Sequence, residues 1–247
     1  MSRWKAAAIH LGLSAAVATT IIVTMLSLWY PPPYFLLMGG TMLVVLIVGC
    51  DVVLGPLITA IIFKSGKKGL IFDLAVIAFL QSIALTYGLY TMFEARPVYT
   101  VFAVDRFEVT AANEISSSEL ERASPEYASL PLTGPRVVAA ILPADPQERL
   151  GIAMRAMGGG TDIKALPRLY APYKSIATTA AEKARPLAQL EKKNPLASAR
   201  VIAELRNDPS APHASGYLPI VGRFRSMTAI VNKRSGEIET IVNVNPW

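Results

Sequence analysis

The sequence predicts a membrane protein in which a three-helix N-terminal transmembrane anchor precedes a soluble α+β domain. Three long apolar runs lie early in the 247-residue chain, and each exceeds the ~20 apolar residues that a helix needs to cross a bilayer. These runs are Ala6–Trp29, Leu36–Phe63 and Leu70–Phe93. No later segment is comparably apolar, and strand-like and helix-like segments alternate there. We therefore divide the chain into an anchor, residues 1–93, and a soluble domain, residues 94–247.

The charges next to the apolar runs predict the side of the membrane on which the soluble domain lies. The N-terminal tail carries Arg3 and Lys5, the first loop (30–34) has no charge, and the second loop (64–69) carries three lysines. Short basic loops stay in the cytoplasm, so we expect the N-terminus there and the soluble domain in the periplasm. The first run is too long for a signal-peptide core of ~7–15 residues, so we expect it to be retained as an anchor.

Cysteine and charge narrow the class of protein further. The single cysteine, Cys50, lies in the second run, so the soluble domain has no disulfide, thiolate metal site or cysteine nucleophile. This fits a bacterial inner-membrane protein whose outer domain forms its own core. Five of the 24 basic and two of the 18 acidic residues precede Glu94, so both parts are mildly positive. Acidic residues interleave with the basic ones, so we expect no nucleic-acid partner. The mildly positive charge instead favours contact with the lipid bilayer.

Four polar side chains at membrane depth form a candidate intramembrane site. They are His10, Asp51, Asp73 and Gln81. The helical rise places Asp51 and Gln81 at one level, ~16–18 Å from the cytoplasmic ends of their runs, where they could hydrogen-bond. Asp73 and His10 lie near the cytoplasmic edge, where Lys67 or Lys68 could reach Asp73.

Three interpretations of these polar residues stay open. They could fix the register of helices that have no hydrophobic drive to associate in lipid, which is the simplest interpretation. Alternatively, Asp51 contacts the polar part of a partner transmembrane helix, or the residues form an ion pathway. Pro56 follows Asp51 by five positions and predicts a helix kink beside the carboxylate.

In the soluble domain, alternating and β-branched segments predict strands at both ends, which we expect to pair in one sheet. The strand-like segments are Val98–Val104, Phe107–Thr110, Arg136–Leu142, Tyr217–Val221, Phe224–Val231 and Glu237–Val244. Helices are expected over Ser116–Arg122, from the N-cap Asp145 to Met157, and over Ser175–Ala184 and Ala197–Leu205. The segment 184–196, rich in Pro, Ala and Lys, is expected to be irregular.

The soluble domain shows no motif for catalysis, a cofactor or a metal. His213, its only histidine, has no acidic or cysteine neighbour at ligand spacing, and Gly158–Gly160 lacks the Lys-Ser/Thr ending of a phosphate loop. We therefore expect no enzyme. Arg223 and Arg225 flank Phe224 on a predicted strand, so both would project from one face. They could bind carboxylates of a partner protein in the periplasm, or form an ordinary charged surface.

Several blocks of this sequence resemble the TfpX/TfpZ-type type IV pilin accessory proteins of Gram-negative bacteria. They are Trp4-Lys5, Ile9-His10-Leu11, Trp29-Tyr30-Pro31, Asp51–Leu70, Phe72-Asp73-Leu74, Val101–Phe107, Leu218–Phe224 and Met227-Thr228-Ala229. The resemblance implies a non-enzymatic, chaperone-like helper of type IV pilus assembly, dedicated to a major pilin. It carries no catalytic residues over to this chain.

A mechanism follows from this resemblance. A pilin before assembly is held in the membrane by one apolar N-terminal helix, with its globular head outside. The anchor would shield that helix through Asp51 and Pro56, while Arg223 and Arg225 would contact the head. The competing class is a membrane-anchored periplasmic sensor or ligand-binding module.

Overall fold

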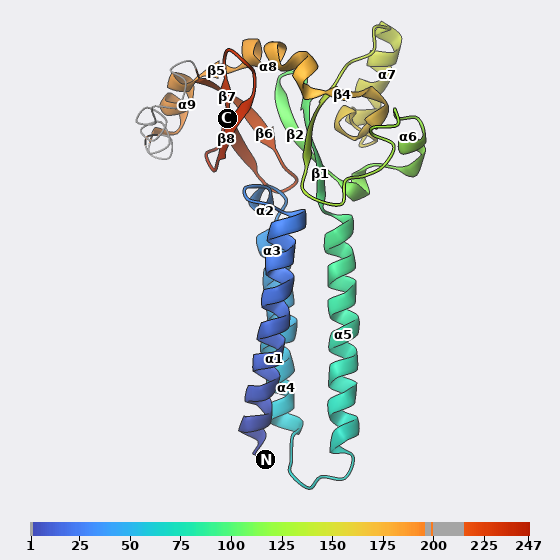
Figure 1. Cartoon of the computed structure of the whole chain (residues 1–247), viewed down its shortest axis with the longest axis vertical. Helices are drawn as coiled ribbons and strands as arrows, with labels where there is room; N and C mark the ends of the chain where they lie inside the picture. The colour runs from blue at the N-terminus through green and yellow to red at the C-terminus, as the bar shows by residue number, and fades with distance from the viewer. Residues whose placement is uncertain (1, 196–198, 200–214) are drawn as a thin grey trace.

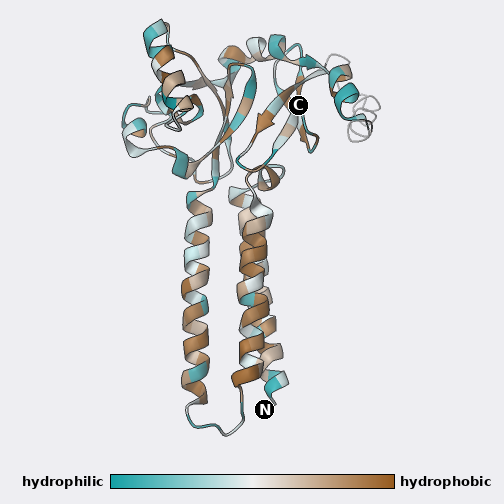
Figure 2. Cartoon of the chain, turned by 180° about the vertical axis from the view of Figure 1, so that it is seen from behind, coloured by the Kyte–Doolittle hydropathy of each residue, from teal (hydrophilic) through white to brown (hydrophobic). Residues whose placement is uncertain are grey.

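The computed structural model describes residues 2–195, 199 and 215–247. Within them, three helices are long and apolar enough to cross a membrane. They form a stalk below a mixed sheet with flanking helices, which confirms the predicted fold class (Figure 1). Figure 2 shows the apolar residues concentrated along the stalk.

The spanning helices are built from several segments. The first consists of α1 (Arg3–Thr24) and a π-helical turn, Met25–Trp29, and the third is α5 (Leu70–Glu94). The second consists of α3 (Gly40–Ile47), a π-helical segment, Val48–Leu54, and α4 (Gly55–Ile62). The π-helical segment ends just before Pro56, which has no N–H to donate and whose ring would clash with the carbonyl four residues earlier.

The second spanning helix begins at Gly40, later than the expected Leu36. Pro31–Pro33 cannot supply the N–H groups of a helix, and Gly39 adopts a φ of 80°, which interrupts helical backbone. Between them lies only the short helix α2 (Tyr34–Leu37). Residues 30–39, here called the junction loop, therefore fold as a separate element between the stalk and the sheet.

The sheet has the strand order β4-β3-β1-β2-β6-β7-β8, and β5 pairs with β6 outside this path. The strands are β1 (Pro97–Ala103), β2 (Arg106–Ala111), β3 (Arg136–Ala140), β4 (Tyr170–Pro172), β5 (Arg185–Pro186), β6 (Ser215–Val221), β7 (Ser226–Asn232) and β8 (Ile238–Val242). The pairs β1–β3 and β2–β6 are parallel, and the others are antiparallel. The pairing of β2 with β6 joins the two ends of the domain in one sheet, as the sequence predicted.

The helices of the soluble domain are short. Among the described residues, the α-helices are α6 (Ser117–Glu121), α7 (Pro146–Met157), α8 (Ala177–Lys183) and α9 (Leu187–Lys193). Asp145 caps α7 as expected, accepting hydrogen bonds from the N–H groups of Gln147 and Glu148. The prediction that residues 184–196 are irregular is wrong. β5 and α9 occupy most of this segment, and Leu190 is fully buried beside Tyr217. Apart from Ala199, the helix expected at Ala197–Leu205 lies outside the described residues, as does the loop around His213.

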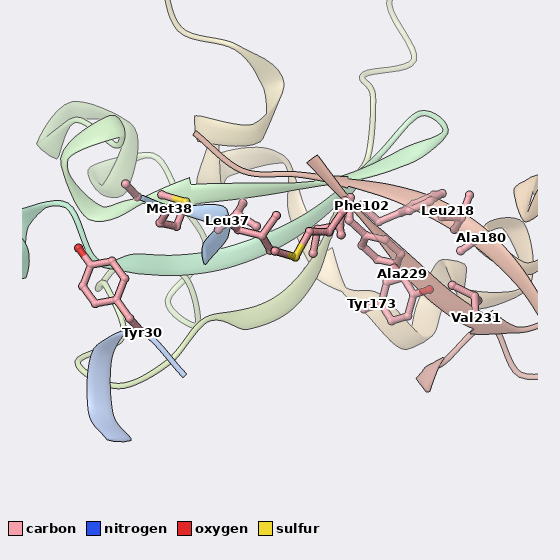
Figure 3. Close-up of a cluster of buried hydrophobic side chains, with 14 of the residues drawn as sticks. Tyr30, Leu37, Met38, Phe102, Tyr173, Ala180, Leu218, Ala229 and Val231 are labelled. Carbon is pink, nitrogen blue, oxygen red and sulfur yellow. The ribbon is translucent and has the colours of Figure 1, made fainter. Parts of the chain in front are cut away.

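The core of the sheet continues into the stalk without a break. Tyr30, Leu37 and Met38 of the junction loop belong to the same buried cluster as Phe102 and Leu218 of the sheet (Figure 3). The Tyr30 hydroxyl donates to the carbonyl of Met92 at 2.8 Å. The Thr100 hydroxyl donates to the Tyr34 hydroxyl at 3.0 Å, and the N–H of Gly134 to the carbonyl of Leu28 at 2.7 Å. The stalk and the sheet are therefore joined by packing rather than by a free linker.

Candidate functional site

The stalk contains a long groove between its helices. The first and second spanning helices lie side by side (Figure 1), and α5 packs less closely against them, meeting the second at Gln81. In the most apolar 18-residue window of each spanning helix, 28% of the residues of the second are buried but only 11% of the first and 6% of α5. The groove has a volume of about 450 Å³. It is lined by Ala6, Ile9, His10, Leu13, Ser14, Val17, Asp51, Thr59, Phe63, Leu74, Ala78, Gln81, Ser82 and Leu85.

The lining residues follow the helical repeat on two facing helices. On α1 they recur every three or four positions from Ala6 to Val17, and on α5 from Leu74 to Leu85. Each stripe therefore runs along one helix face for about three turns, or ~16 Å at the helical rise. The groove is elongated along the helix axes, and small residues such as Ala78 and Ser82 leave room for a close neighbour.

Asp51 and Gln81 meet in the middle of the groove, as their calculated depths predicted. Gln81 Nε2 lies 3.5 Å from Asp51 Oδ1 and 3.4 Å from the Asp51 backbone carbonyl. Asp51 is only 8% exposed. Gly55 makes this approach possible, because a Cβ atom there would lie 2.2 Å from Gln81 Nε2. Both hydrogen bonds are long, so the pair keeps capacity for a further partner.

His10 also belongs to the groove. Its Nδ1 atom lies 2.7 Å from the Thr59 hydroxyl, so that α1 and α4 are joined by a hydrogen bond at membrane depth. Sequence reasoning missed Thr59, as well as Ser14 and Ser82. For Ser82, the stripe Ala78, Gln81, Ser82 on one face of α5 was the signal that could have found it.

The remaining intramembrane candidates lie elsewhere. Asp73 forms a salt bridge with Lys67 of the lysine loop, as its position near the membrane edge predicted, and does not line the groove. Pro56 is buried within α4, where it follows the π-helical segment that holds Asp51. The structure thus brings together His10, Asp51 and Gln81 in the groove, and leaves Asp73 outside it.

Arg223 and Arg225 lie in a turn rather than on a strand, which corrects the expected alternation. Residues 222–225 connect β6 to β7, and β7 begins only at Ser226. The N–H of Phe224 donates to the carbonyl of Leu37 at 3.1 Å, so the turn rests on the junction loop. Burial raises the pKa of Tyr30 in that loop, and nearby Arg96 and Arg223 oppose the rise.

Together these features define a membrane-anchored α+β protein with a partly polar groove between its spanning helices. Residues 1–39 match the family model of the fimbrial assembly protein FimB. The chain is 32% identical over 246 residues to the fimbrial assembly protein, serogroup I, of Dichelobacter nodosus, covering 98% of this chain and 95% of that protein.

Two further relatives come from the same organism. The fimbrial assembly protein, serogroup E1, is 32% identical over 205 residues, which is 82% of this chain and 79% of that protein. The protein of serogroups C1 and C2 is 39% identical over 121 residues, which is 48% of this chain and 92% of that protein. No solved structure matches the chain significantly. The chain belongs to the family of fimbrial assembly proteins.

Proposed function

We propose that this protein is an inner-membrane accessory protein of type IV pilus biogenesis. It acts as a chaperone-like helper that holds the transmembrane helix of a cognate major pilin in the groove before assembly. Its N-terminus is cytoplasmic and its α+β domain periplasmic, on the side of the pilin head. This is the activity that the resemblance to TfpX/TfpZ-type proteins implies, and the fimbrial assembly relatives support the process in which it acts.

The groove is the observation that carries this proposal. Its two lining stripes run parallel to the membrane-spanning helices, which suits another helix better than a compact ligand. A single apolar helix, such as the one that holds an unassembled pilin, would cover faces of α1 and α5 that the protein itself leaves uncovered.

The polar residues of the groove give the contact its strength and its position. Asp51 and Gln81 hold each other only through long hydrogen bonds, so each can accept or donate a further one to a polar group of the entering helix. Such bonds in membranes contribute about 0.6–2 kcal/mol each. Contacts of this size favour a reversible complex, as a helper that releases its pilin for assembly requires.

Site-specific photocrosslinking in native membranes tests the proposal. A photoreactive amino acid replaces Ser82, which lines the groove, and in a matched control it replaces Ile83, an exposed neighbour outside the groove. We expect a crosslink to the major pilin from position 82 and little from position 83. Equal crosslinking from both positions, or normal surface pili in a strain without this protein, would contradict the proposal and favour a sensor or ligand-binding module.

A further inference from the structure

The turn of residues 222–225, here called the arginine turn, lies at the sheet end of the stalk, where we expect the spanning helices to leave the membrane. It rests on Leu37 of the junction loop, and the second spanning helix begins three residues later, at Gly40. On the other two spanning helices, Trp29 and Phe93 form an edge-to-face contact with ring centres 5.3 Å apart. Both residues lie at the ends of their helices next to the sheet, where aromatic belts form at the bilayer surface.

Two glycines fix the arginine turn on the junction loop. A Cβ atom at Gly39 would lie 2.5 Å from the Phe224 ring, and one at Gly222 would lie 2.4 Å from the Leu37 carbonyl oxygen. The Phe224 ring is therefore seated on bare backbone at the start of a spanning helix. It is nevertheless 64% exposed. A large apolar ring is thus presented at membrane level from a fixed backbone.

The two arginines beside this ring have no acidic partner among the described residues. Arg223 and Arg225 are exposed and belong to none of the salt bridges found there. Arg225 only reaches the side-chain oxygen of Asn243, at 3.4 Å. Arg96, at the same end of the stalk, is different, because it is 4% exposed and donates to the carbonyls of Phe93 and Pro131. The guanidinium groups of the turn are therefore available to an external anion.

We propose that the arginine turn binds the headgroup phosphate of an anionic phospholipid in the leaflet next to the soluble domain. Arg223 and Arg225 bind the phosphate oxygens, and the Phe224 ring enters the interfacial region beside the junction loop. A partner protein's carboxylate would satisfy the same arginines. The lipid is favoured because an exposed aromatic ring at the level of Trp29 and Phe93 meets the bilayer interface there.

Lipid binding to the purified full-length protein tests this inference. Native mass spectrometry with phosphatidylglycerol and phosphatidylcholine would compare the double variant Arg223→Gln, Arg225→Gln with the double variant Lys233→Gln, Arg234→Gln. The control removes the same charge from the exposed turn between β7 and β8, at the opposite ends of the strands that the arginine turn connects. We expect ~30-fold weaker phosphatidylglycerol binding in the first variant only. Unchanged binding, or an equal loss in both variants, would overturn the inference.

A second measurement distinguishes lipid from protein without removing the arginines. The photoreactive residue p-benzoylphenylalanine replaces Phe224 in native membranes. Adducts with phospholipid support the inference, and a dominant adduct with a protein overturns it in favour of a protein contact. Neither result depends on what occupies the groove, so crosslinking from position 82 tests the proposed function separately.

Discussion

The apolar side chains of the sheet and those of the stalk differ in how far they are buried. All seven residues of β1 are buried, whereas only 6% of the most apolar window of α5 is buried. The sheet forms its own core in water, while the stalk leaves most of its apolar surface to lipid or to another helix. The contrast indicates that the packed core of this protein lies in the sheet and its junction with the stalk, and that the stalk carries most of the uncovered apolar surface.

The Asp51–Gln81 pair of the groove shows the same contrast with two hydroxyl groups of the sheet. In the sheet, the hydroxyl of Thr110 donates to the Lys164 carbonyl at 2.9 Å and that of Thr228 to the Val244 carbonyl at 2.8 Å. In the groove, Gln81 reaches Asp51 only at 3.4–3.5 Å. Well-paired buried groups rigidify a fold, and loosely paired ones can exchange partners. Four substitutions test this contrast between a well-packed sheet and a loosely packed stalk.

The largest effect is expected from removing an aromatic ring from the sheet core. Phe102 is 2% exposed and packs against Phe107 and Tyr173. Phe102→Ala should lower the free energy of unfolding by about 3–5 kcal/mol, because the cavity would not collapse fully. Phe79→Ala, which truncates a ring 65% exposed on α5, should have little effect. Thermal unfolding in detergent, followed by near-UV circular dichroism, compares them, and equal losses would contradict the contrast.

A smaller effect is expected where the helices of the stalk touch. Gly55→Ala places a methyl group 2.2 Å from Gln81 Nε2, whereas Gly49→Ala in the same spanning helix meets no described atom within 4 Å. Overpacking should cost about 1–3 kcal/mol for Gly55→Ala and should push Gln81 away from Asp51. Thermal stability and crosslinking from position 82 measure the two consequences. If Gly49→Ala had the same effect, the contact between α5 and the second spanning helix would not matter.

Removing the groove carboxylate should change binding more than folding. Asp51→Ala should lower pilin crosslinking from position 82 about three- to tenfold, the range that one or two intramembrane hydrogen bonds provide. The unfolding of the soluble domain should be unchanged, since Asp51 lies outside its core. Asp73→Ala serves as the control, because this second carboxylate does not line the groove. Undiminished crosslinking and piliation in Asp51→Ala would remove Asp51 from the proposed contact.

The smallest effect concerns a carboxyl group within the sheet. Burial raises the pKa of Glu108, nearby Asp162 adds to the rise, and Lys164 and Arg106 oppose it. A carboxyl with a higher pKa in the folded chain binds more protons there, so stability falls as pH rises from the unfolded to the folded pKa. Glu108→Gln should therefore raise the melting temperature by roughly 2 °C at pH 7 and change it little at pH 4. The exposed Glu121→Gln is the control, and a lower melting temperature at pH 7 would refute the sign.

The sequence allowed much of the stalk to be predicted, because each inference rested on a local pattern. Apolar length located the spanning helices, and the constant helical rise brought Asp51 and Gln81 to one level. The alternation of apolar residues likewise located most strands. These signals need only the neighbours along the chain, or a fixed geometry between them.

The rest depended on contacts between distant segments. The helix α9 packs onto the fold because Leu190 is buried in one cluster with Tyr217. No local pattern around residues 184–196 indicates this contact. Residues 36–39 of the junction loop resembled the start of a spanning helix, whereas Leu37 and Met38 belong to the core of the sheet. The arginine turn was assigned to a strand for the same reason, since the hydrogen bond from Phe224 to Leu37 joins residues almost 190 positions apart.

The junction loop also affects how the sheet is held on the stalk. Tyr30 and Leu37 are fully buried between stalk and sheet, and four hydrogen bonds hold the same joint, so bending there would break packed contacts. We therefore expect the outer part to keep one height and orientation above the bilayer. A polypeptide that rises out of the groove would then always meet the same edge of the outer part, in the same alignment.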